Sequence, residues 1–297
     1  MPRAQIRLLP EGRRLHLNDG PIDLIIEAFG AADQIELAYR AASARFVTTL
    51  DELCAELPLL RREPSLESWP TGVIARRMAE AVTPYSAQCF ITPMASVAGA
   101  VAEEILQAMT NAATLDKAYV NDGGDIALHL EPGQHFVVGM IERPDRPSLL
   151  GTATLTAAQP VRGIATSGWR GRSFSLGIAD AVTVLADTAA MADAAATIIA
   201  NAVDLPGHPA VLRVPARDLA PDNDLGERPV TQAVGALTDR EISSALAAGV
   251  KWAHSLLSNS LIRAAALHLQ GQTRVVGDTL PLAQPATVGV EEGLIHA

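Results

Sequence analysis

Apolar and polar residues alternate over two short segments near the start of the chain, residues 5–9 and 14–17, which flank the turn Pro10-Glu11-Gly12. A period of two is typical of strands with one buried face, so these segments predict two strands joined by a turn. The next apolar segment, residues 22–29, follows Pro21. Because proline is favoured in the first turn of a helix, we expect a helix there.

Apolar residues then recur at the three- and four-residue spacing of helices along three longer segments. We predict one or two helices within residues 31–59, a helix over 72–82 that Thr83-Pro84 ends, and a helix over 97–110. The last of these has small residues on one side, so its backbone can approach a ligand or another helix closely.

Short apolar segments separated by turn residues dominate the middle of the chain. We expect a β-meander over residues 118–120, 126–130 and 136–141, and further strands over 161–165, 181–186 and 210–214. Toward the end we expect a helical section from the capping box Thr238 to Glu241 up to about residue 269, a strand over 273–276 and a tail from residue 281. Strands interleaved with helices, joined by turns of hairpin length, predict an α+β fold with a largely antiparallel sheet.

One predicted helix carries polar side chains on a single face. It is rich in alanine and follows the strand over 181–186, and its residues Asp193, Thr197 and Asn201 recur at intervals of four. The opposite face, which would meet a core, is formed by Met191, Ala195, Ile198 and Ile199. A carboxylate on so apolar a helix needs hydrogen-bond donors or a cation. Two interpretations stay open: Asp193 binds a ligand, or it caps a neighbouring element or meets water.

Glycines and polar residues occupy the turn between the strands over 118–120 and 126–130. Gly123 and Gly124 permit positive φ and leave backbone N–H groups uncovered, which suits a phosphate or pyrophosphate. Asn121 and Asp125 flank them with groups that can order the turn or reach a metal. The alternative is an ordinary Gly-Gly hairpin turn.

A second polar turn, Thr166-Ser167-Gly168, follows the strand over 161–165. It offers hydroxyls and bare backbone beside Trp169, whose ring can stack on a planar ligand; the alternative is again a plain turn. The chain has no Walker-type phosphate loop, no dinucleotide-binding GxGxxG after a strand and no HExxH zinc motif. Ser167 lacks the flanking glycines of a nucleophile elbow.

Charge and cysteine content narrow the class of protein. The net charge is −10 and the pI about 5.2, and basic residues cluster only in pairs, which disfavours nucleic acid or an anionic membrane as partner. Two cysteines, Cys54 and Cys89, make a disulfide framework or a cysteine zinc site a poor interpretation. The sequence shows no signal-peptide pattern and no apolar segment of about 18 residues, so we expect no membrane association and a cytoplasmic location.

Four segments resemble, in the same order, conserved blocks of the ApbE-type flavin transferases: residues 121–126, 164–168, 180–186 and 191–197. The chain is most similar to a short, uncharacterised cytoplasmic branch of that superfamily, whose members carry a Ser-rich loop like Ser173 to Gly177. The similarity covers about residues 91–203. It implies a single α+β domain of ApbE-like fold over residues 1–297, with the terminal segments packed around that core.

The resemblance also implies ligands and their residues. It implies FAD or FMN as the flavin nucleotide and Mg²⁺ as the metal, with Asp193, Thr197 and the carbonyl of Ser96 as metal ligands. The catalytic residues that it implies are Asp193 and Asp180. The flavin-binding residues that it implies are Asn121, Gly123, Gly124, Asp125, Thr166, Ser167, Gly168, Ser173 and Ser175. In the family a threonine hydroxyl of a partner protein attacks the FMN phosphorus and AMP leaves.

The chain departs from the family pattern in two blocks. Pro93 and Gly99 stand where an acid and a lysine of the family contact FAD. A lysine near a pyrophosphate supplies a charge-assisted hydrogen bond that glycine cannot supply. A His-x-x-Asp-Pro block of the family is replaced by the Ser-rich loop, and only Asp180 matches it.

These observations leave three hypotheses open. The first is an FAD-binding, Mg²⁺-dependent enzyme that acts at the flavin pyrophosphate, by FMN transfer to a partner flavoprotein or by hydrolysis of FAD to FMN and AMP. The second is a flavin carrier or maturation factor without turnover, and the third is a structural relative with a degenerate pocket. The small-residue segment Ala95 to Ala102 is compatible with packing in a homodimer.

Overall fold

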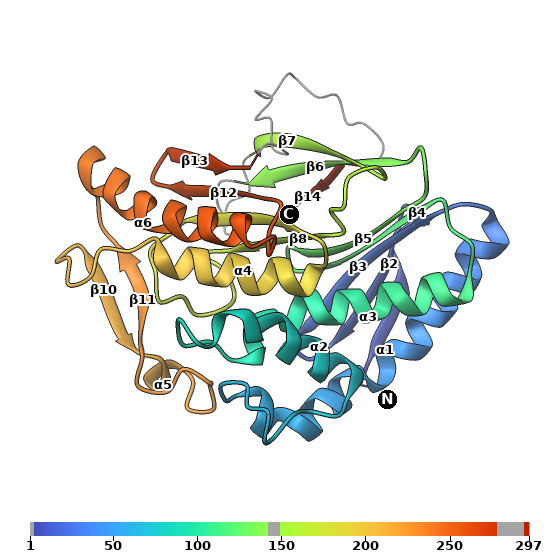
Figure 1. The fold of residues 1–297 in the computed structure, drawn as a ribbon. Helices are drawn as coiled ribbons and strands as arrows, with labels where there is room; N and C mark the ends of the chain where they lie inside the picture. Colours follow the sequence, from blue (N-terminus) through green and yellow to red (C-terminus); the bar gives the residue numbers. More distant parts are fainter. Residues whose placement is uncertain (1–2, 142–148, 278–293, 297) are drawn as a thin grey trace. The chain divides into compact units, whose positions relative to one another are not determined.

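The computed structural model describes residues 3–141, 149–277 and 294–296, and Figure 1 traces them. The chain forms two compact units, each assembled from separate segments of the sequence. Unit 1 comprises Met1–Phe136, Leu155–Ile164 and Asp187–Ala192, and unit 2 comprises Val137–Thr154, Ala165–Ala186 and Asp193–Ala297. The prediction of a single domain over residues 1–297 stays a prediction.

Unit 1 is built on an antiparallel sheet whose strands follow one another in sequence order. They are β1 (Gln5–Leu8), β2 (Leu15–Asp19), β3 (Ile22–Phe29), β4 (Lys117–Asp122) and β5 (Asp125–Leu130). The first residues of β8 (Gly163–Ser167) pair with β5 on its other side. The predicted hairpin at the start of the chain is confirmed, with Leu8 opposite Leu15.

The helix expected over residues 22–29 is wrong, because this segment is strand β3. Its alternate residues Ile22, Leu24 and Ile26 are buried, which is the period of a strand with one face on a core. Gly20, with a φ of 59°, and Pro21 form the two-residue turn that brings β3 back beside β2. The proline therefore belongs to a hairpin and does not start a helix.

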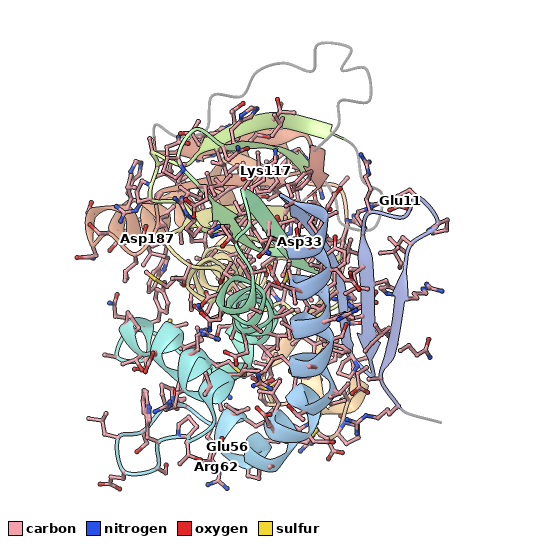
Figure 2. The ribbon with its side chains drawn as sticks, turned by 90° about the vertical axis from the view of Figure 1, so that its right-hand side faces the viewer. Glu11, Asp33, Glu56, Arg62, Lys117 and Asp187 are labelled. Atoms are coloured by element: carbon pink, nitrogen blue, oxygen red, sulfur yellow. The ribbon has the colours of Figure 1, made fainter. Side chains whose placement is uncertain are left out.

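Three helices complete unit 1: α1 (Ala32–Leu60), α2 (Val73–Val82) and α3 (Val97–Ala112). Two short 3-10 helices, η1 (Thr83–Tyr85) and η2 (Pro93–Ser96), connect α2 to α3. Helix α1 packs on β2 and β3, and α3 packs on β4, β5 and α1 (Figure 1). Figure 2 labels Glu56 on α1, whose carboxylate accepts hydrogen bonds from the backbone N–H groups of Thr71 (2.7 Å) and Gly72 (2.6 Å) at the start of α2. The three predicted helical segments are confirmed.

Unit 2 contains the strands β9 (Ala181–Ala186), β12 (Ala264–Leu269) and β13 (Gln272–Val276), with β8 beside β9. β12 lies between β9 and β13 and is antiparallel to both. Helix α6 (Asp239–Ser258) packs on β12 and β13, and it begins with the predicted capping box of Thr238 and Glu241. Helix α4 (Ala189–Ala202) belongs to unit 2 from Asp193 onward.

The helical section expected up to about residue 269 is wrong beyond Ser258. The segment Ala264–Leu269 is strand β12, and every one of its residues is buried. Alanine favours helices, but a six-residue apolar run between turns can also be a fully buried strand. Pairing on both sides decides the outcome, since β12 gains a ladder with β9 and another with β13.

Two smaller sheets complete the described chain. β10 (Val211–Pro215) and β11 (Pro229–Val234) form a hairpin with the short helix α5 (Ala216–Leu219) between them. β6 (His135–Ile141) pairs with β14 (Leu294–His296) and β7 (Leu149–Thr156). The predicted meander is therefore wrong at its third strand, because β6 joins this second sheet and not β5. Most of the tail predicted from residue 281 lies outside the described residues.

Helices and a large antiparallel sheet together confirm the predicted α+β class. In the ranges that the structure describes, no helix combines the length and the apolar character that crossing a bilayer requires.

Candidate functional site

Helix α4 is buried on most of its surface, and its polar residues mark the part that is not. Its alanines between Ala189 and Ala200, together with Ile198 and Ile199, are buried. Asp193, Thr197 and Asn201 are half-buried and stand on one face at intervals of four, as the sequence predicted. Met191, expected to face the core, is also only half-buried. The face carrying Asp193 is therefore the less buried side of the helix.

The start of α4 is held by side chains of unit 1. The Thr188 hydroxyl accepts a hydrogen bond from the N–H of Met191 (3.3 Å), and the Glu103 carboxylate accepts one from the N–H of Ala190 (2.7 Å). An acid is favourable at a helix N-terminus because it meets the positive end of the helix dipole. These contacts fix the first turn of α4. Asp193 and Thr197 lie in the next turns of the same helix.

Helices α3 and α4 approach so closely at Gly99 that no side chain fits there. A Cβ atom at position 99 would overlap the carbonyl group of Ala189 and lie 2.8 Å from the N of Ala190. Gly99 of α3 therefore packs against the start of α4 within unit 1. Position 99 has no room for the lysine that the family pattern carries.

The third polar residue of the α4 face, Asn201, holds the Ser-rich loop. Its side-chain oxygen accepts hydrogen bonds from the N–H of Leu176 (2.9 Å) and the hydroxyl of Ser175 (3.3 Å). Gly177 packs so closely on α4 that a Cβ there would overlap the carbonyl of Ala200. Of the two predicted flavin-binding serines, Ser175 is buried in these contacts and Ser173 is exposed.

Asp180 is buried and joins two loops of unit 2. Its carboxylate accepts hydrogen bonds from Nε of Arg170 (3.0 Å) and from the backbone N–H of Gln270 (2.7 Å), in the turn between β12 and β13. The Arg170 guanidinium also lies over the ring of Trp169, 4.0 Å from its centroid. One face of the ring expected to stack on a ligand is thus already covered. Nε1 of Trp169 has no hydrogen-bond partner within the described ranges.

The turn after β8 combines hydroxyls with a close approach of backbone. Thr166 shares a 2.8 Å hydrogen bond with the hydroxyl of Thr183 on β9. A Cβ atom at Gly168 would overlap the carbonyl of Asp180, so this position requires glycine. Ser167, between them, is half-buried. Thr166, Ser167, Gly168 and Asp180 are therefore neighbours in unit 2.

The glycine turn of unit 1 has the geometry of a two-residue hairpin. Gly123 (φ 66°) and Gly124 (φ 117°) connect β4 to β5, with Asp122 opposite Asp125. The N–H of Gly124 donates to the side-chain oxygen of Asn121 (2.8 Å), so one of the two predicted phosphate donors is engaged within the turn. The hairpin interpretation fits this geometry. The role of these residues in flavin binding stays a prediction.

Ser96, whose carbonyl is a predicted metal ligand, is buried in unit 1 where η2 meets α3. Its hydroxyl lies 3.1 Å from the carbonyl of Met78 and 3.0 Å from that of Pro93, and its single hydrogen is shared between these two acceptors. Across the described parts of the chain, no three histidine, cysteine, aspartate or glutamate residues gather as a metal cluster would. A metal at Asp193 would thus take its other ligands from hydroxyls, carbonyls, water or a bound phosphate.

The sequence alone does not predict the roles of Glu103, Arg170 and Gln270. Glu103 is 87 residues from the N–H group that it binds, and Gln270 holds Asp180 through its backbone, so neither leaves a local signal. Arg170 does leave one, because it is a basic residue in the loop that leads to a buried aspartate.

Comparison with known proteins assigns the family. The model of the family described as "AbpE bacteria" matches residues 6–275. A UPF0280 protein of Methanopyrus kandleri is 36% identical over 164 residues, which are 55% of this chain and 58% of the relative. A UPF0280 protein of Methanothrix thermoacetophila is 32% identical over 190 residues, 58% of this chain and 70% of the relative. The first of these matches thus spans less than two thirds of the relative's own length.

Two solved structures of the flavin transferase ApbE from Vibrio cholerae also align. A mutant form aligns over 89% of this chain and 96% of its own, at 12% identity and a TM-score of 0.37. The other aligns over 66% and 86%, at 14% identity and a TM-score of 0.31. With TM-scores this low, the assignment rests on the family model and the sequence relatives. The chain belongs to the bacterial AbpE family, a branch of the ApbE-like superfamily.

Proposed function

We propose that this protein binds FAD with Mg²⁺ and acts at the flavin pyrophosphate. The observation that carries the proposal is the half-buried pair Asp193 and Thr197 on the otherwise buried helix α4. It coincides with the block whose Asp-x-x-x-Thr pair binds the metal in the flavin transferases that the chain resembles. Membership of the ApbE-like superfamily supports a flavin nucleotide as ligand.

The residues present suit magnesium. Mg²⁺ prefers hard oxygen ligands and is usually held by one or two carboxylates, waters and the phosphates of the substrate. Asp193 offers one carboxylate, and Thr197 offers a hydroxyl one turn further along the same face. When bound, the metal would neutralise charge on the pyrophosphate.

In the proposed reaction one phosphoanhydride bond is exchanged for another bond at the FMN phosphorus. The oxygen of a partner's threonine hydroxyl bonds to that phosphorus, and the bond to the bridging oxygen breaks. The electron pair of the broken bond leaves on the AMP phosphate, and the hydroxyl proton passes to water. In hydrolysis a water molecule replaces the hydroxyl. We assign metal binding to Asp193 and Thr197. Asp180 engages Arg170 and the N–H of Gln270, so we propose that it positions the loop after β8.

One observation favours the second candidate function, a flavin carrier without turnover. The contact of α3 with Ala189 excludes any side chain at Gly99. The family's lysine, which would add a positive charge beside the pyrophosphate, therefore has no counterpart at this position. Less charge neutralisation leaves binding through the metal possible but slows the transfer of the phosphoryl group.

Incubation with FAD and Mg²⁺, followed by chromatography for FMN and AMP, separates the two functions. AMP release that is abolished in Asp193→Asn supports the enzyme, with FMN either free or attached to protein. Bound FAD that stays intact supports the carrier. If neither FAD nor FMN binds in the presence of Mg²⁺, the flavin proposal is wrong.

A matched control measures the effect of removing a carboxylate that is not a predicted metal ligand. Asp218, on α5, has a side chain that is 58% exposed, and its nearest ionic contact is 3.8 Å from Arg217. Asp218→Asn should bind and turn over FAD like the wild type. Equal losses in Asp193→Asn and Asp218→Asn would remove the support for a metal at Asp193.

A further inference from the structure

A cavity of about 300 Å³ is lined only by residues of unit 1. It is bordered by the C-terminal half of α3, the middle of β5, the residue before β8 and the loop that enters α4, where Figure 2 labels Asp187. Its volume is that of about ten water molecules and lies at the lower end of the range for ligand sites. On α3, the lining residues begin at Glu103, about two turns beyond Ser96.

Arg162 places a positive charge in the wall of this cavity, and its guanidinium forms no ion pair with a carboxylate of the described residues. Its Nη1 donates to the carbonyls of Gln159 (2.7 Å) and Val161 (2.6 Å), and its Nη2 donates to the carbonyl of Ala157 (3.0 Å). Three of the five N–H groups of the guanidinium are thus engaged with neutral acceptors. The other two, the Nε–H among them, have no partner in the part of the chain that the structure describes. The guanidinium is held in place and retains donors for an anion.

The second arginine of the cavity, Arg77, is already neutralised. It forms ion pairs with Glu103 (2.9 Å) and Glu104 (3.0 Å), and Glu103 also accepts the N–H of Ala190 at the start of α4. That side of the cavity is therefore closed to an anion, and the N-terminus of α4 is not an anion site. Arg162 remains as the cationic end.

The rest of the wall is partly polar and partly apolar. His129 has Nε2 3.2 Å from the carbonyl of Leu115, which fixes Nε2 as a donor and leaves Nδ1 without a protein partner among the described residues. Leu106, Ala127 and Leu128 supply apolar surface. A ligand with one anionic end and a small apolar body would match this distribution.

We propose that this cavity binds a small organic carboxylate, with the carboxylate against Arg162. A planar carboxylate presents two acceptor oxygens to the two remaining N–H donors of the guanidinium. A monoanion fits better than a phosphate dianion, because the carboxylates of Glu103 and Asp187 also line the cavity and would repel a second negative charge. Asp193, Thr197 and Asn201 do not line this cavity, and the proposal does not rest on the flavin chemistry proposed for Asp193.

Benzoate and benzamide test the proposal, because the two probes have the same shape and differ in charge. Each is titrated into ¹⁵N-labelled full-length protein, and the amide chemical shifts are followed by NMR. We expect benzoate to shift the amides of residues 106–110, 127–129 and 187–188, and to bind at least tenfold more tightly than benzamide. Equal affinities, shifts confined to other residues or no shifts at all would overturn the proposal. Inorganic phosphate that binds more tightly than benzoate would overturn the choice of a carboxylate.

Variants of Arg162 assign the effect to its charge. Arg162→Gln should weaken benzoate binding at least tenfold, and Arg162→Lys, which keeps the charge without the planar fork, should weaken it less. Arg62→Gln, a change at an exposed arginine labelled in Figure 2, is the matched control and should bind benzoate like the wild type. Unchanged binding by Arg162→Gln would overturn the proposal. Should that variant fail to fold, the comparison of benzoate with benzamide on the wild type still decides.

Discussion

Gly99 shows how a single residue type can be required by its neighbour. The backbone of α3 runs so close to Ala189 and Ala190 that hydrogen is the only side chain with room at this position. A larger residue would push α3 and the first turn of α4 apart. That turn also carries the hydrogen bond from Ala190 to Glu103, so the strain would reach the base of the face that bears Asp193.

We therefore expect Gly99→Ala to destabilise the protein by about 2 kcal/mol, because overpacking of a tight contact typically costs about 1–3 kcal/mol. Urea unfolding measures this as a lower midpoint. Gly235→Ala is a suitable control, since a Cβ there meets its nearest atom at 3.4 Å and the residue is exposed. If the two variants unfold at the same urea concentration, the close contact at Gly99 is wrong.

At the scale of an element, the start of α6 depends on one carboxylate. Glu241 accepts hydrogen bonds from the backbone N–H (2.7 Å) and the hydroxyl (2.8 Å) of Thr238, and it lies 2.9 Å from Nε2 of His208. The backbone hydrogen bond, and then the contact with His208, lower the pKa of Glu241 from 4.5 to about 2. The ionised form is thus favoured in the folded protein.

A pKa lowered by folding predicts the direction of a pH effect. The contribution of Glu241 is fully present above pH 4.5 and is lost as the pH falls through about 2. We expect Glu241→Gln to lose less stability than the wild type between these pH values, as measured by urea unfolding. Glu67→Gln, at an exposed glutamate outside any helix, should keep the wild-type pH dependence. Identical pH profiles for the wild type and Glu241→Gln would contradict the role of the capping box.

The Ser-rich loop provides a second test at this scale, because Asn201 of α4 ties it down. Asn201→Ala would leave the N–H of the half-buried Leu176 without its acceptor, and the loop would lose the hydrogen bond that ties it to α4. We expect amide hydrogen exchange over residues 172–177 to accelerate at least tenfold, with α6 unaffected. Asn201→Asp keeps an acceptor oxygen and should restore slow exchange. Fast exchange in Asn201→Asp as well would show that another contact holds the loop.

Local sequence patterns predict where helices and strands lie better than they predict which strands pair with one another. The helices α1, α2 and α3 and the hairpin of β1 and β2 follow from spacing and turn residues alone. The local sequence predicts helix for the segments 22–29 and 264–269, and both are strands. Pairing with strands distant in sequence decided both, and no local window contains that information.

At the scale of the whole molecule, the same distinction applies to the candidate site. The stripe of Asp193, Thr197 and Asn201 was predictable because it arises from the period of one helix. The contacts that hold that helix were not predictable, since they come from another helix. Glu103 and Gly99 of α3 contact the first residues of α4. Likewise the sequence placed Asp180 near the site but could not reveal that Arg170 and Gln270 bind it. Side chains that share one face of a helix are thus easier to predict than the contacts that position that helix.

Metal removal tests the candidate site through the stability of the whole protein. An ion that binds only the folded state adds about 2.7 kcal/mol of stability at a hundred times its Kd. For a chain of this size each kcal/mol corresponds to about 2–4 °C in Tm, so Mg²⁺ should raise the Tm by several degrees and EDTA should reverse the rise. Asp193→Asn removes the anionic ligand, and its Tm should respond to neither reagent. Asp218→Asn should respond like the wild type. If neither Mg²⁺ nor EDTA changes the Tm of the wild type, the protein binds no stabilising Mg²⁺. If the Tm of Asp193→Asn still responds to both reagents, Asp193 is not a ligand of the metal.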